Sequence, residues 1–142
     1  QAEVIAIPAP GHAKDLTCLF FPKQKYLFSG DMYISKSLKY LRSDENLQQL
    51  ITSLETLIEL DFEILFCPHR GIVEQGKQAL KEKRDNLLNM CRQSQTLMAQ
   101  GLSESEIVVA LLGPEDRLAK ISKFNISKGN LIRQAMLYNV KD

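Results

Sequence analysis

Short apolar segments that stop beside proline or glycine make up most of the first seventy residues. Apolar residues dominate 4–7, 16–21, 26–31 and 63–67, and turn residues follow or end each run. Runs of four to eight residues between such turns are typical of β-strands. We therefore predict a sheet in this part of the chain, in which the second and third segments form a hairpin.

A helical pattern interrupts the strands between residues 43 and 60. Ser43 is a suitable N-cap, and acidic residues follow it in the next turn. The apolar residues recur at helical spacing, at Leu47, Leu50, Ile51, Leu54, Leu57 and Ile58. This spacing predicts an amphipathic helix that packs on the sheet.

The pattern changes to helices from Lys77 onward. One long helix is predicted over 77–100, where Gly101 ends it, and Ser103 is expected to cap a second helix that runs to Leu112. Shorter helices are predicted over 114–121 and 127–138. The sequence thus favours an α/β class, with a sheet in residues 1–76 and a helical region in 77–142.

Composition excludes several functional classes. The 142 residues are 44% hydrophobic, and 18 basic residues face 17 acidic ones, which gives a net charge of +1. No overall field therefore attracts nucleic acid or an anionic membrane. Neither a membrane-spanning run nor a signal-peptide pattern is present, and the three cysteines have no metal or redox spacing, so we expect a cytoplasmic protein with reduced thiols.

Three predicted strands end close to a candidate metal ligand: His12, Asp31 and His69. Gly11 and Gly30 directly precede two of them, and a residue without a Cβ allows a sharp turn there. Imidazole nitrogen and carboxylate oxygen are ligands that zinc and similar divalent ions accept. Both histidines and Gly-Asp also suit ordinary surface turns, so spacing alone leaves a metal site and simple turns as alternatives.

Two stretches resemble the carboxy-terminal half of metallo-β-lactamase-fold metallo-hydrolases: PAPGHAKDLTCLFFPKQKYLFSGDMYI and ILFCPHRG. The resemblance covers residues 4–71 in the family's order and spacing. It implies that residues 1–76 are the carboxy-terminal half of an αββα sandwich. Residues 77–142 then resemble the small helical or winged-helix-like appendages that follow some domains of this fold.

The resemblance also implies a role for each candidate ligand. His12 would bind a first metal, His69 a second, and Asp31 would bridge both as the catalytic carboxylate. The implied cofactors are two divalent ions, with zinc first and iron or manganese as alternatives. The family's upstream His-x-His-x-Asp-His motif does not occur in this sequence, so we expect weak metal binding and no activity in this chain alone.

Two functional hypotheses follow. In the first, the parent protein is a hydrolase in which a metal-activated hydroxide attacks an ester, thioester, lactam or phosphodiester of a small-molecule substrate. In the second, the chain is a non-catalytic assembly module that retains half of the fold. Its apolar sheet face would then be covered in a homo-oligomer, by the missing amino-terminal half, or by the tail folding back on it. The sequence does not select the substrate class.

Three other features of the sequence give weaker functional information. Residues 71–78 read GIVEQGKQ and match a phosphate-binding loop, except that Gln78 replaces the hydroxyl residue that would hold magnesium, so we expect an ordinary loop. The few basic residues of the tail lack interleaved aromatics, which argues against nucleic-acid binding. Cys67 lies on an apolar strand and is predicted to be a buried thiol.

Overall fold

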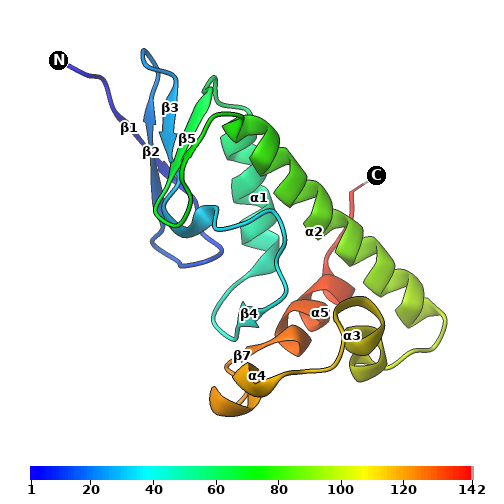
Figure 1. Cartoon of the computed structure of the whole chain (residues 1–142). Coiled ribbons are helices and arrows are strands. Elements are labelled where there is room, and N and C mark those ends of the chain that lie inside the picture. Colours follow the sequence, from blue (N-terminus) through cyan, green and yellow to red (C-terminus); the bar gives the residue numbers. More distant parts are fainter. Residues whose placement is uncertain (142) are drawn as a thin grey trace.

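A computed structural model describes residues 1–141 as a sheet with helices along one face and a helical region below them (Figure 1). The sheet has the strand order β1-β2-β3-β5-β6, with bounds Ile5–Pro8, Thr17–Phe21, Tyr26–Phe28, Ile64–Cys67 and Gly71–Val73. A separate two-stranded ribbon pairs β4 (Leu41–Arg42) with β7 (Ile126–Ser127). The helices are α1 (Leu47–Ile58), α2 (Gly76–Ala99), α3 (Glu104–Leu112), α4 (Arg117–Ile121) and α5 (Lys128–Leu137).

Strand direction brings three strand ends together. β2 is antiparallel to both β1 and β3, and β3 is parallel to β5. β1, β3 and β5 therefore run in one direction, and their carboxyl ends lie at the same end of the sheet. The connection from β3 to β5 passes through α1, as parallel neighbours in a sheet require.

The predicted hairpin of β2 and β3 is confirmed, but two predicted boundaries are wrong. The strand expected over 26–31 ends at Phe28, because Gly30 has a φ of 53° and residues Gly30–Met32 form a short 3₁₀ turn, η1. The helix expected after Ser43 begins at Leu47, because Asn46 is the N-cap and accepts a hydrogen bond from Gln49 N.

Other predicted elements agree with the structure, and some were missed. Gly101, with a φ of 92°, directly follows the last turn of α2, and Ser103 accepts a hydrogen bond from Glu106 N at the start of α3. The loop expected over 71–78 is partly wrong, since 71–73 form β6. The β4–β7 ribbon was not predicted either, because strands of two residues leave no periodic pattern.

One hydrophobic core joins the sheet to the helices. The apolar face of α1 is buried as predicted, and Leu27 and Leu65 of the sheet are fully buried against it. The same core includes Leu80 and Leu87 of α2 and Leu131 of α5. Packing thus continues across the expected domain boundary at residue 76, and that boundary stays a prediction.

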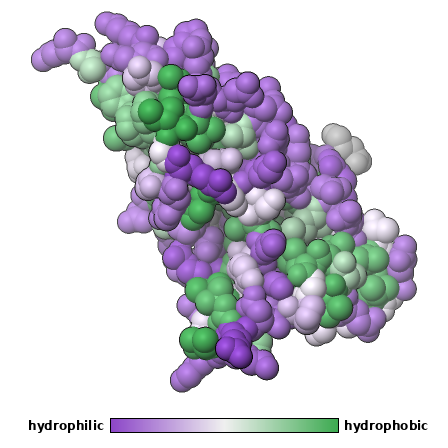
Figure 2. All heavy atoms as spheres, in the orientation of Figure 1, coloured by the Kyte–Doolittle hydropathy of each residue, from purple (hydrophilic) through white to green (hydrophobic). Residues whose placement is uncertain are grey.

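The opposite face of the sheet exposes a row of apolar side chains. Leu19 is paired with Phe28, Phe28 with Phe66, and Phe66 with Ile72, so the four form one cross-strand row on the face away from α1. Leu19, Phe28 and Ile72 are 41, 40 and 63% exposed, and a cavity of about 470 Å³ lies over the row. Apolar atoms reach the surface over the sheet and again over α3 (Figure 2).

None of the helices within residues 1–141 has both the length and the apolar character needed to cross a membrane.

Gly11 is where the loop after β1 touches α1. Its φ is 138°, and a Cβ built on it would lie 2.5 Å from the N and Cα of Leu50. Gly11 O also accepts a hydrogen bond from Asn46 N, the residue that caps α1. The loop that carries His12 therefore lies directly against the backbone of the helix.

We expect Gly11→Ala to lower the free energy of unfolding by about 2 kcal/mol more than Gly113→Ala does. Gly113 also has a positive φ, 77°, but a Cβ there meets no atom within 4 Å, so this control carries the backbone strain without the collision. Urea unfolding of both variants measures the difference. Equal losses would mean that the contact with Leu50 relaxes without cost.

Candidate metal centre

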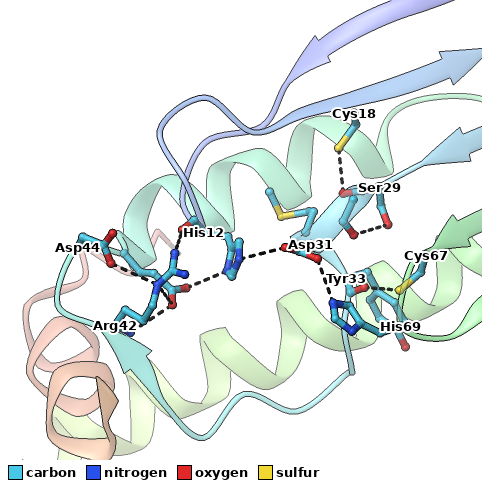
Figure 3. A network of polar contacts seen from close by, with 12 residues as sticks. His12, Cys18, Ser29, Asp31, Tyr33, Arg42, Asp44, Cys67 and His69 are labelled. Carbon is cyan, nitrogen blue, oxygen red and sulfur yellow. Dashed lines mark hydrogen bonds and ion pairs between the residues drawn. The ribbon is translucent and has the colours of Figure 1, made fainter. Parts of the chain in front are cut away.

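The three candidate ligands lie at the shared carboxyl end of β1, β3 and β5. His12 is in the loop after β1, Asp31 is in η1 directly after β3, and His69 is in the turn between β5 and β6. Figure 3 shows the three side chains pointing toward one another from these separate segments. Common strand direction thus brings together residues that are 19 and 38 positions apart.

The carboxylate of Asp31 lies between the two imidazoles. Its Oδ1 is 3.0 Å from His69 Nε2, and its Oδ2 is 3.6 Å from His12 Nε2. Each carboxylate oxygen faces a different histidine, as the predicted bridging role would require. The side chains of His12, Asp31 and His69 are 21, 45 and 50% exposed, so the centre is open to solvent on the side of His69.

The backbone that follows Asp31 is fixed by side chains from three other segments. Three successive carbonyls each accept a hydrogen bond: Met32 O from Lys83 Nζ at 2.6 Å, Tyr33 O from Cys67 Sγ at 2.6 Å, and Ile34 O from Arg70 Nε at 3.1 Å. The predicted core position of Cys67 is confirmed, since it is 4% exposed and lies in the main core. These contacts hold the η1 turn against β5 and α2.

A second set of polar contacts surrounds His12 on the side away from Asp31. His12 Nδ1 is 3.3 Å from Glu45 Oε2, and Arg42 Nη2 donates a hydrogen bond to His12 O at 2.8 Å. Arg42 N donates to Glu45 Oε1 at 3.1 Å, and Arg42 also forms an ion pair with Asp44. His12 is therefore held through both its ring and its backbone (Figure 3).

Lys83 is a buried cation next to the centre. It is 4% exposed, and burial lowers the pKa of its ammonium group to about 8, an effect that the negative charge of Glu45 opposes in part. A small cavity is lined by Lys83 together with His12, Asp31 and Glu45. The positive charge of Lys83 thus lies within the same polar cluster as the two carboxylates.

The structure brings the three sequence-predicted residues together, and their role as metal ligands stays a prediction. The sequence did not single out Glu45, Arg42 or Lys83. The helical spacing of α2 placed Lys83 on the same face as Leu80 and Leu87, which was the only signal available for it. Glu45 and Arg42 lie in a charged, turn-like stretch that has the composition of a solvated loop. Within residues 1–141, no group of three or more His, Cys, Asp or Glu side chains is arranged to hold a single metal ion.

The fold of the chain resembles that of known proteins. A metallo-beta-lactamase family protein from Thermus thermophilus matches 96% of this chain with a TM-score of 0.67 and 15% identity. The stereoselective inverting sec-alkylsulfatase Pisa1 from Pseudomonas sp. matches 95% with a TM-score of 0.68 and 15% identity. The chain spans 43% of the first protein and 24% of the second. No family model and no curated protein sequence matches the chain.

These likenesses establish the fold. The predicted α/β class is confirmed, and the partial coverage of both proteins agrees with a chain that holds one part of a metallo-β-lactamase fold.

The buried Lys83 predicts a distinct pH dependence of stability. Between pH 8 and 10.5 the unfolded chain keeps this proton while the folded chain releases it, so this group makes the free energy of unfolding rise with pH. The rise amounts to about 3 kcal/mol and is lost again as the pH falls through 8.

Lys83→Met removes the titrating group and should remove this rise. Urea unfolding between pH 8 and 10.5 gives the free energy of unfolding of both proteins. The contributions of tyrosine and cysteine titration cancel when the variant is subtracted from the wild type. Parallel profiles for the two proteins would show that Lys83 keeps its ordinary pKa in the folded state.

Proposed function

We propose, from the metallo-β-lactamase fold and the position of Asp31 between two imidazoles, that this chain is the carboxy-terminal part of a metal-dependent hydrolase. The observation that carries the proposal is that Oδ1 and Oδ2 of Asp31 face different histidines, 3.0 and 3.6 Å away. Simple surface turns would not require three strand ends to direct their polar side chains to one point. The fold explains why they converge, and the donor atoms suit divalent cations.

The donor set fits two incomplete metal sites. His12 Nε2 with Asp31 Oδ2 would contribute to one ion, and His69 Nε2 with Asp31 Oδ1 to the other. Two protein ligands for each ion are fewer than the three that catalytic zinc usually has. Further ligands would come from outside this chain, in a longer protein that includes it. Zinc is proposed first because nitrogen and carboxylate ligands suit it, and iron or manganese would accept the same donors.

The residues of this chain have distinct roles in the proposed reaction. When bound, divalent ions supply an activated water at neutral pH and polarise a substrate oxygen. Asp31 sets the separation of the two sites and offsets their positive charge. His69 is half exposed, so substrate approaches from its side. The proposed reaction is hydrolysis of an ester, thioester, lactam or phosphodiester of a small molecule.

Asp31→Asn tests the proposal in this chain. Added Zn²⁺ should shift the ring signals of His12 and His69 together in a nuclear magnetic resonance titration. The variant should bind Zn²⁺ about tenfold more weakly or worse, because the bridging charge is lost. In the longer protein, Asp31→Ala should abolish turnover.

Asp61→Asn is the matched control. Asp61 is 81% exposed and pairs with Lys25, which directly precedes β3 at the opposite end of the sheet from the centre. If both variants bound Zn²⁺ equally well, or if only one histidine responded in the wild type, Asp31 would not bridge two sites.

A second candidate function, an assembly module, is favoured by the exposed sheet row. A continuous apolar stripe crosses four strands, formed by Leu19, Phe28, Phe66 and Ile72. On a typical monomer, exposed apolar side chains are scattered singly instead. We propose that the isolated chain covers this face with a second copy of itself, and that a longer protein covers it with another part of the sandwich.

Leu19→Ser with Ile72→Ser should weaken self-association at least tenfold, since burial of each aliphatic side chain contributes about 1.5 kcal/mol. The control is Leu137→Ser with Ile121→Ser, which makes the same changes at side chains 79 and 78% exposed in the helical region. Light scattering coupled to size-exclusion chromatography measures the association. A wild type that stays monomeric at its highest soluble concentration would rule out the assembly role for the isolated chain.

A further inference from the structure

We propose that Glu45 is a positioning residue that holds the His12 ring with a proton on Nδ1 and with Nε2 free to bind a metal ion. The inference rests on the proposed function, because it assumes that His12 is a metal ligand. Glu45 would orient the His12 ring without binding the metal itself.

The two ring nitrogens of His12 face different carboxylates. Nδ1 is 3.3 Å from Glu45 Oε2, and Nε2 is 3.6 Å from Asp31 Oδ2. An ionised carboxylate only accepts hydrogen bonds, and of the two carboxylates only Glu45 lies within hydrogen-bonding distance of the ring, so a neutral imidazole carries its proton on Nδ1. The lone pair of Nε2 is then directed toward Asp31, where the proposed ion would lie.

Glu45 is itself held in place before any ligand arrives. Its side chain is only 9% exposed, and its Oε1 accepts a hydrogen bond from Arg42 N at 3.1 Å. The guanidinium of Arg42 lies 3.4 Å from the same oxygen and also donates to His12 O. Gln134 of α5 donates to Glu45 O at 2.8 Å. The carboxylate therefore has little freedom to turn away from the ring.

Glu45 is not a third ligand of the same ion. It contacts Nδ1, whereas Asp31 faces Nε2 on the other side of the ring, so one ion cannot contact Nε2 and Glu45 together. Its other oxygen is occupied by Arg42.

Long-range ¹H–¹⁵N spectra of the chain report which ring nitrogen carries the proton, at a pH where both imidazoles are neutral. The chain has two histidines, and His69→Gln assigns the remaining signal to His12. We expect the Nδ1-protonated form in the wild type and a shift toward the Nε2-protonated form in Glu45→Ala. Glu45→Gln keeps an acceptor oxygen and should restore the wild-type form.

Asp44→Ala is the matched control. Asp44 pairs with the same arginine, is 72% exposed and has no contact with His12 among the polar contacts of the described residues, so its loss should leave the tautomer unchanged. A second readout is Zn²⁺ affinity, which Glu45→Ala should lower about 10- to 100-fold and Asp44→Ala should not change.

The two readouts separate this inference from the proposed function. An unchanged His12 tautomer in a folded Glu45→Ala chain, or an unchanged Zn²⁺ affinity where the wild type binds, overturns the positioning role. If the tautomer shifts as expected but Zn²⁺ does not bind to wild-type His12, the metal function is overturned and only the ring orientation stands.

Discussion

The shared direction of β1, β3 and β5 is the constraint on which the candidate centre depends. Because β2 runs opposite to its two neighbours, and β3 is parallel to β5, three separate turns emerge at one end of the sheet. Two of these turns carry a histidine and one carries Asp31. Reversing any of the three strands would move its polar residue to the far end of the sheet, about 10 Å or more away for a short strand.

The convergence of the strand ends does not by itself set the direction of the side chains. Contacts from the helices hold the loops that carry them. Backbone of η1 is held by Lys83 from α2, and the stretch that contains Glu45 is held by Gln134 from α5. Gln134 also accepts a hydrogen bond from Leu47 N, at the first turn of α1. Residues from the helical region thus fix the positions of loops at the sheet end. The burial of the Lys83 ammonium is the energetic cost of one of these contacts.

The strands, the main helices and the three central residues could be predicted because each leaves a local signal. Apolar runs that end at proline or glycine mark strands, and the joint position of His12, Asp31 and His69 after such runs points to one site. The helix start was expected at Ser43, which has equally good capping chemistry, but Ser43 bonds to Asn125 while Asn46 N bonds to Gly11 O and the Asn46 side chain caps α1. Glu45, Arg42 and Lys83 were missed because their roles come from contacts between distant segments, which single-sequence patterns do not contain.

The exposed sheet row and the candidate metal centre are connected through β3 and β5. Phe66 lies three residues before His69, and Phe28 lies three residues before Asp31, so two members of the apolar row lie on the strands that lead into two of the three candidate ligands. Covering the row would remove water from the cavity beside Gly30 and Pro68, which border Asp31 and His69. Electrostatic attraction between a cation and Asp31 strengthens as the local dielectric constant falls. A partner on this face would bury the apolar row, and it would also strengthen the attraction between Asp31 and a cation while raising the cost of removing that cation from water.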